Sequence, residues 1–273
     1  MKKLKKAKHF INSAYNEKKS LQALRNFDNI TECIAEVFLK LKNEDFTQEE
    51  LQTFANLEKY RERLLLSDEV ISYDFFGSDH KDTVRQICKK AASPKIWCQF
   101  LHLLIKRIQA KYILEIGTNL GISGQYYLSG MPNHVEHQFI TLEGIPRLCE
   151  ISKERFMELG LSTQNEVIQG DFKETVPQVI KNHRSFDFVF IDGNHQYEPT
   201  VSYFNQLKST YTNNAVLVFD DIYWTSDMEK AWHQIKNDTN VSCAIDFFKA
   251  GLLIFNPNSQ KEKLNINLFL SRD

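Results

Sequence analysis

The sequence has few cysteines, no surplus of either charge and no long apolar run. Its 34 basic and 35 acidic side chains give a formal net charge of −1, so no global positive field favours nucleic acid. The five cysteines form no C-x-x-C pair, which argues against a disulfide framework or a zinc site. No segment reaches the roughly 18 apolar residues that cross a bilayer. The basic start, MKKLKKAKHF, lacks the apolar core of a signal peptide, so we expect a cytoplasmic protein without membrane contact.

The first 110 residues show the spacing of three and four between apolar side chains that is typical of helices packed on one face. Residues 30–41 show it clearly, and residues 4–11 offer a second candidate face. A capping box at residues 47–50 and the pair Ser93-Pro94 mark the starts of two further helices. Residues 73–80 are expected to form a loop.

Strand and helix patterns alternate after residue 110, which predicts βαβ units and a mostly parallel sheet. The expected strands are 112–116, 138–142, 166–169, 186–191, 215–219, 242–248 and 252–256. Only Lys249-Ala250-Gly251 separate the last two, and so short a link makes them antiparallel neighbours. Alternating leucine and isoleucine at 264–270 predict a final edge strand. Residues 1–92 are thus expected to be a helical extension that covers a pocket or forms a homodimer seam, and residues 93–273 the α/β domain.

A glycine turn follows the first of these strands. The segment KYILEIGTNLGISG at residues 111–124 reads as a strand, a turn and a helix start, where open α/β sheets bind nucleotide-like ligands. A dinucleotide fingerprint needs a second glycine two residues after the first, and Asn119 holds that position. The turn therefore suits a nucleoside without a pyrophosphate, of which S-adenosylmethionine is the common example. The candidate binding residues are Glu115, Gly117, Thr118, Asn119 and Gly121.

Acidic residues also end the second and third strands. Glu143, followed by Gly144, is placed to accept both ribose hydroxyls, although a solvated loop charge is the alternative. Asp171 is placed to accept the adenine amino group, with Phe172 near the ring. Glu115 is a candidate for the ammonium end of the methionine moiety, and a helix cap or a structural hydrogen bond explains it equally well.

The fourth and fifth strands end in FIDGNHQY and FDDIYW. Neighbouring strand ends would bring Asp192, His195, Asp220 and Asp221 to one pocket rim. The sequence shows no arginine or lysine beside them, so such a cluster calls for a cation, a shared proton or separation by solvent. Oxygen ligands of this kind suit Mg²⁺, Ca²⁺ or Mn²⁺. The alternatives are that His195 caps the next helix and that the aspartates make hydrogen bonds without a metal.

The ordered series EIGTNLG, TLEG, GDF, IDGNHQY and FDDIYW resembles the class I S-adenosylmethionine-dependent methyltransferases, and within them the small-molecule O-methyltransferase group. The resemblance covers residues 93–256. It implies a Rossmann-like seven-stranded sheet, five parallel strands closed by an antiparallel hairpin. It also implies cofactor contacts from the residues that the motifs share with the family, which are Glu115, Gly117, Glu143 and Asp171.

The resemblance further implies catalytic roles at the fourth and fifth strands. In metal-dependent members the positions of Asp192, Asp220 and Asp221 bind Mg²⁺, and the position of His195 holds the base that deprotonates the hydroxyl. Two residues depart from the pattern, since the family has asparagine at Asp221 and the catechol type has lysine at His195. An imidazole with its ordinary pKa of about 6.5 serves as a base at neutral pH.

The sequence therefore predicts methyl transfer from S-adenosylmethionine to a hydroxyl of a small-molecule acceptor, with Asp192 and His195 as catalytic residues. Asp192 is also expected to contact the cofactor. Tyr223, Trp224 and Met228 are candidates for the acceptor site. An RNA-directed methyltransferase is one alternative, based on the N-terminal lysines. A cofactor-binding interaction protein without catalysis is another. The methyltransferases that act on exocyclic amines carry N/D-P-P-Y/F where this chain has IDGN.

Overall fold

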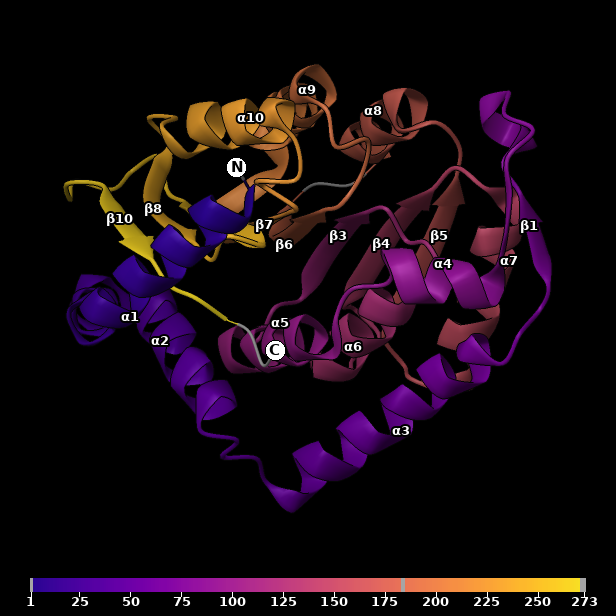
Figure 1. Cartoon of the computed structure of the whole chain (residues 1–273), viewed down its shortest axis with the longest axis horizontal. Helices are drawn as coiled ribbons and strands as arrows, with labels where there is room; N and C mark the ends of the chain where they lie inside the picture. The colour runs from indigo at the N-terminus through magenta and orange to yellow at the C-terminus, as the bar shows by residue number, and fades with distance from the viewer. Residues whose placement is uncertain (1, 183–184, 271–273) are drawn as a thin grey trace. The chain divides into compact units, whose positions relative to one another are not determined.

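The computed structural model describes residues 2–182 and 185–270 (Figure 1). The chain falls into two compact units, Met1–Leu39 with Val176–Asp273 and Lys40–Thr175. The extension expected over residues 1–92 contributes to both units, and its separation from residues 93–273 remains a prediction. Within the described ranges, no helix combines the length and the apolar character needed to cross a bilayer.

The first unit contains five strands whose order follows from their pairing. They are β6 (Phe186–Ile191), β7 (Tyr211–Asp220), β8 (Val241–Asp246), β9 (Ala250–Phe255) and β10 (Leu264–Asn267). β6 and β7 are parallel neighbours, and β9 lies antiparallel between β7 and β8. β10 runs parallel to β8 and adds an edge strand to the seven-strand pattern. The expected hairpin and the final edge strand are therefore both confirmed.

The helices of this unit agree with the sequence pattern except near the start of the first one. They are α1 (Lys2–Phe27), α2 (Asn29–Lys42), α8 (Phe172–Asn182), α9 (Tyr197–Leu207) and α10 (Ser226–Lys236), with the 3-10 turn η2 (Lys208–Thr210). The face expected on α2 is buried, but the face expected near the start of α1 is wrong. Leu4 and Ile11 are 76% and 66% exposed. Polar contacts hold this end of α1, because His9 Nε2 bonds the Leu268 carbonyl at 2.9 Å, and apolar burial begins only at Leu21.

The second unit has a parallel sheet and a short hairpin. Its strands are β3 (Tyr112–Ile116), β4 (Gln138–Glu143) and β5 (Gln164–Gln169), in the parallel order β3-β4-β5. β1 (Val70–Ser72) and β2 (Lys81–Thr83) pair antiparallel, with the 3-10 turn η1 (Asp74–Phe76) between them. Residues 73–80, expected as a loop, form the connection between the two strands of this hairpin. Strands of three residues are too short to show alternation, so β1 and β2 could not be predicted from the sequence.

The helices of the second unit begin largely where the sequence indicates. They are α3 (Gln48–Leu65), α4 (Val84–Ala91), α5 (Lys95–Ile108), α6 (Ile122–Gly130) and α7 (Pro146–Glu158). The capping box is confirmed at Thr47 and Glu50, and Pro94 is the N-cap of α5. A second capping box, at Thr83 and Gln86, starts α4, which the sequence analysis did not predict.

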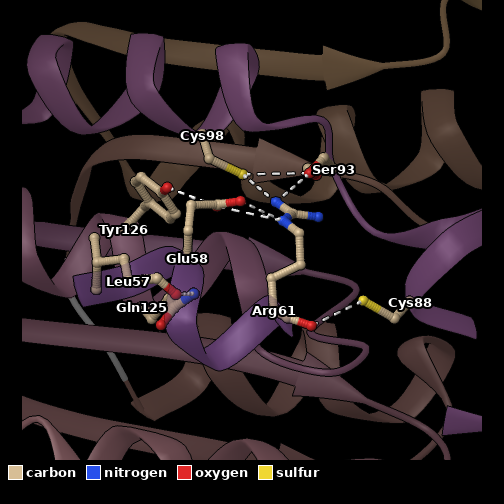
Figure 2. A network of polar contacts seen from close by, with 8 residues as sticks. All are labelled: Leu57, Glu58, Arg61, Cys88, Ser93, Cys98, Gln125 and Tyr126. Carbon is tan, nitrogen blue, oxygen red and sulfur yellow. Dashed lines mark hydrogen bonds and ion pairs between the residues drawn. The ribbon is translucent and has the colours of Figure 1, made fainter. Parts of the chain in front are cut away.

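A buried polar network fixes α3 against α6. Figure 2 shows the Glu58 carboxylate between Arg61 and Tyr126. Glu58 accepts hydrogen bonds from Arg61 Nε at 3.0 Å and from the Tyr126 hydroxyl at 2.8 Å. Arg61 Nη2 also donates to the Ser93 carbonyl at 2.9 Å, just before α5. Since α6 starts directly after the glycine turn, this network helps to position that turn.

We expect Arg61→Met to lower the free energy of unfolding by about 3 kcal/mol, because it leaves the Glu58 carboxylate with its charge unpaired at a site only 15% exposed. Urea unfolding followed by circular dichroism measures the change. Arg63→Met is the matched control, since Arg63 pairs with Glu158 at the surface and exposed pairs contribute less than about 1 kcal/mol. Equal losses in the two variants would contradict a structural role for the buried network.

Candidate functional site

The glycine turn after β3 has the geometry that its residues predict. Gly117 and Gly121 have φ angles of 104° and 72°, in the left-handed region that favours glycine. A Cβ on Gly121 would also lie 3.0 Å from the Ser152 Cβ. Asn119, at φ 50°, is one of the few other residue types that tolerate this region. The turn is therefore constrained both by its backbone and by the helix packed against it.

Tyr60 ties this turn to α3. Its hydroxyl donates to the Leu120 carbonyl at 2.7 Å, and the residue is 4% exposed. The sequence analysis did not select Tyr60. The available signal was its place on the buried face of α3, three residues after Leu57 and four before Leu64, where an apolar residue would otherwise be expected.

Glu143, the last residue of β4, lies beside the same turn. Its carboxylate accepts the backbone N–H of Asn119 at 2.8 Å and that of Ile145 at 2.9 Å. The side chain is 7% exposed, so burial raises the pKa of this carboxyl and the N–H donors oppose the shift. The structure thus brings Glu143 and Asn119 together, as a common ligand would require, and argues against a solvated loop charge.

Gly144 allows two phenylalanines to approach the end of β4. A Cβ at this position would overlap the Phe76 ring and lie 3.1 Å from Phe75 Cε1. The two rings meet edge to face with centroids 4.9 Å apart. Phe75 is 41% exposed and Phe76 is 55% exposed. An exposed aromatic pair therefore stands next to Glu143 and Gly144. The sequence analysis missed this pair, because residues 73–80 read as a loop.

Glu115 is fully buried beneath the turn. Its carboxylate accepts from the Ser123 hydroxyl and from Thr141 Oγ1 at 2.7 Å, and Thr141 in turn lies 2.5 Å from Thr118 Oγ1. Burial raises the pKa of Glu115 to about 8. These contacts support the structural hydrogen bond that the sequence left open. Contact of Glu115 with a cofactor ammonium, and of Thr118 with the cofactor, stay predictions.

The raised pKa of Glu115 predicts a dependence of stability on pH. Between about pH 4.5 and pH 8 the folded state keeps a proton that the unfolded state has lost, so stability falls as pH rises through this window. The slope is up to about 1.4 kcal/mol per pH unit. We expect Glu115→Gln to remove this slope, as measured by urea unfolding at several pH values. Glu166→Gln, an exposed change on β5, is the control and should keep it.

Asp171 caps α8. Its Oδ1 accepts the Lys173 N–H at 2.9 Å, and its carbonyl accepts the Thr175 N–H at 2.9 Å. These bonds satisfy helix N-terminal donors that otherwise lack partners. Phe172 is the first residue of the helix. The adenine-binding roles of Asp171 and Phe172 remain predictions.

Asp192 and His195 form a pair after β6. Ile191 of β6 is in register with Phe219 of β7, so Asp192, just after β6, lies at the same sheet edge as Asp220, the last residue of β7. The His195 Nε2 lies 3.4 Å from Asp192 Oδ1, and the two side chains are 32% and 19% exposed. Asn194 and His195 have φ angles of 62° and 40°. Two consecutive left-handed residues that are not glycine are costly, and such strain is concentrated at functional sites.

The surroundings of the His195 ring argue against a capping role. The N-cap of α9 is Gln196, so His195 does not cap that helix. The imidazole stacks on Trp224, with centroids 5.4 Å apart and an interplanar angle of 15°. Its Nδ1 is buried and has no hydrogen-bond partner among the described residues. One ring nitrogen thus faces a carboxylate, and the other is buried without a hydrogen-bond partner among the described residues.

The two other candidates for the acceptor site, Tyr223 and Met228, contact residues of the same unit, and their roles toward the acceptor stay predictions. The Tyr223 hydroxyl donates to Asp246 Oδ2 at 2.6 Å, and Met228 is 3% exposed. Both side chains therefore stabilise the interior of the unit. Trp224, 54% exposed and stacked on His195, remains the aromatic candidate for an acceptor wall.

The aspartates after β7 have a basic partner that the sequence did not reveal. Lys249 Nζ lies 2.8 Å from Asp220 Oδ2 and 2.7 Å from Asp221 Oδ1. The expectation that no lysine stands beside these carboxylates is therefore wrong. The two carboxylates raise the pKa of Lys249, while burial raises the pKa of Asp220 and Lys249 opposes that shift. The lysine was missed because it is 28 residues from Asp221 in the chain.

The predicted metal ligands do not fit a divalent ion in this arrangement. The parts of the chain that the structure describes contain no group of three or more His, Cys, Asp or Glu side chains that could hold a metal. An ammonium already contacts one oxygen of Asp220 and one of Asp221. A metal ligated by Asp192, Asp220 and Asp221 would have to displace it.

Comparison with known proteins agrees with this fold and these motifs. A family model described as a methyltransferase domain matches residues 114–222. Catechol O-methyltransferases from Mycobacterium tuberculosis and Niastella koreensis are 32% and 29% identical to this chain, each over 45% of it and over 54% and 55% of their own lengths. The chain thus spans little more than half of the curated relatives that it matches.

The fold is also that of a solved O-methyltransferase. The protein from Bacillus cereus, in complex with SAH, aligns with a TM-score of 0.52 and 21% identity over 60% of this chain and 82% of its own. The motifs in residues 114–222, the parallel strands with an antiparallel β9 and the matching family model agree with one another. Residues 114–222 therefore match a methyltransferase domain, and the chain has the fold of the class I, S-adenosylmethionine-dependent type.

Proposed function

We propose that this protein transfers the methyl group of S-adenosylmethionine to a hydroxyl of a small-molecule acceptor, with His195 as the general base. The observation that carries the proposal is the His195–Asp192 pair at the end of β6, inside the segment that matches the methyltransferase domain. A histidine that faces a carboxylate supports this proposal, because the carboxylate orients the imidazole and stabilises its protonated form.

The residues around the glycine turn are proposed to hold the cofactor. Bound there, S-adenosylmethionine supplies a methyl group that is already activated for transfer. Gly117 and Gly121 give the backbone its turn, and Glu143 presents a buried carboxylate for the ribose hydroxyls. Asp171 and Phe172 are proposed for the adenine. The complex of the Bacillus cereus protein with SAH supports a cofactor of this kind for the fold.

The residues of the chain are proposed to align the acceptor and to remove its proton. Aligning the acceptor oxygen with the methyl group contributes up to about 7–11 kcal/mol. Removal of the hydroxyl proton by His195 contributes about 10²–10⁴-fold. Asp192 is proposed to orient the imidazole and to stabilise the imidazolium that forms. Mg²⁺ assistance is not part of this proposal, because the Asp220 and Asp221 carboxylates bind Lys249.

A methyl-transfer assay with labelled cofactor tests this function. We expect label in catechols or other hydroxylated aromatic acceptors, and calorimetric binding of S-adenosylmethionine without binding of nicotinamide nucleotides. Label in RNA transcripts alone would favour the RNA-directed alternative. Cofactor binding with no transfer to any acceptor would favour an interaction protein. Tight binding of nicotinamide nucleotides and none of S-adenosylmethionine would reject the proposal.

Assembly and location are separate proposals. The exposed apolar residues near the start of α1 and the net charge of −1 are compatible with a homodimer formed through the N-terminal helices in the cytoplasm. Analytical ultracentrifugation and fluorescence of a tagged chain in cells test them. A monomer at all concentrations would reject the dimer, and fluorescence confined to another compartment would reject the location.

A further inference from the structure

The contact between Lys249 and the two aspartates after β7 is built by the sheet. β9 pairs antiparallel with β7, and Ala250 is in register with Asp220. Lys249, which precedes Ala250, therefore lies beside the carboxyl end of β7. The backbone of Lys249 is held as well, since its N–H donates to the Phe247 carbonyl and its carbonyl accepts the Ile222 N–H at 3.3 Å. The lysine is thus a fixed part of the strand end.

The backbone of Asp221 completes the arrangement. Its φ of 52° places this residue in the left-handed region, which aspartate tolerates better than most residues. Asp220 and Asp221 are consecutive, yet both carboxylates reach the same ammonium. Their side chains are 9% and 14% exposed, and Lys249 is 32% exposed. The cluster is therefore largely shielded from water but remains open to a ligand on the side of the lysine.

The charge balance of this cluster differs from that of a metal site. Two carboxylates and one ammonium leave a single negative charge, so the carboxylates no longer need an added cation to offset their repulsion. A divalent ion would have to expel the Lys249 ammonium from the two carboxylates. The ammonium would then lie next to the metal ion without carboxylate partners. The chain thus supplies internally the positive charge that the sequence analysis assigned to a metal.

We propose that Lys249 is the resident cation of this site, so that the Asp220–Asp221 pair binds its ammonium in place of a divalent metal ion. An ammonium has three N–H donors, and two of them are used by the carboxylates. The third is available to an oxygen of the acceptor, where it would favour the deprotonated hydroxyl. This last role rests on the proposed methyl transfer, whereas the exclusion of a metal does not.

Binding of Mn²⁺, followed by electron paramagnetic resonance without cofactor or acceptor, tests the proposal. The wild-type chain should show no stoichiometric site, and Lys249→Met should gain one whose Kd is at least about a hundredfold below that of the weak, non-stoichiometric binding of the wild type. Adding Asp220→Asn to Lys249→Met should abolish the gain. Lys208→Met is the matched control, because it breaks the lysine–aspartate pair with Asp238 without freeing two adjacent carboxylates, and it should gain nothing.

Two results would overturn the proposal. One is stoichiometric Mn²⁺ binding by the wild type that Asp220→Asn abolishes. The other is a Lys249→Met chain with a wild-type circular dichroism spectrum that gains no site. If that variant does not fold, the wild-type titration and its Asp220→Asn counterpart still decide. The readout needs no turnover, so a failure to find methyl transfer would remove only the role toward the acceptor.

Discussion

Replacing His195 with alanine is expected to lower kcat by about 10²–10⁴-fold, the contribution of a positioned general base. The Kd for S-adenosylmethionine should stay nearly unchanged, because the residues proposed to hold the cofactor surround the glycine turn and Glu143. Initial rates with labelled cofactor and calorimetry on the same preparation measure the two quantities. A large loss of kcat with an unchanged Kd would identify His195 as a base.

The control for this variant is His233→Ala, an imidazole on α10 whose side chain is 51% exposed. It should leave both quantities at the wild-type level. Asp192→Asn should also reduce kcat, because it removes the carboxylate next to His195 Nε2. A loss of cofactor affinity in His195→Ala as large as the loss of kcat would remove the base assignment.

Glu143→Gln is expected to raise the Kd for S-adenosylmethionine by about 10- to 100-fold, the size of a lost hydrogen bond to a charged group. The amide nitrogen would replace one acceptor oxygen where Asn119 and Ile145 both present N–H donors. The substitution therefore disturbs the turn as well as the proposed ribose contact. Calorimetric titration of the folded variant gives the affinity.

Glu136→Gln, an exposed change just before β4, is the matched control for cofactor binding and should not alter Kd. The melting temperature of Glu143→Gln separates the two effects of the substitution. A lower melting temperature with unchanged cofactor affinity would mean that Glu143 only supports the turn. A raised Kd in a variant that melts like the wild type would assign the carboxylate to the ligand.

Local signals in the sequence account for the elements and for the turn. The strand at 112–116 matches β3 residue for residue, since an apolar run followed by glycine marks both its identity and its end. The Thr47 capping box gives the start of α3 because the pattern lies within four residues. The prediction that the face near Leu4 is packed was wrong, because burial is not a local property of the sequence. Spacing shows that a face is apolar, but not whether the rest of the chain covers it.

The chemistry of the site depends on distances that the sequence does not contain. The paired aspartates and His195 are visible as motifs, whereas Lys249 becomes a neighbour of the aspartates only because β9 is inserted next to β7. A short link predicts that β8 and β9 pair with each other, but it does not predict the other neighbour of β9. The burial of Glu115 among hydroxyl groups is of the same kind, because Ser123 and Thr141 come from different elements.

The sequence by itself determined the α/β class, most strand positions, the glycine turn and the residues at the strand ends, because each depends on contacts along a short stretch of chain. Only the tertiary structure decided what those residues face. It placed an ammonium between Asp220 and Asp221, hydroxyls around Glu115, backbone N–H groups around Glu143 and Trp224 against His195. Charge compensation and desolvation act through space, so they are fixed by strand order and register and not by the order of residues along the chain.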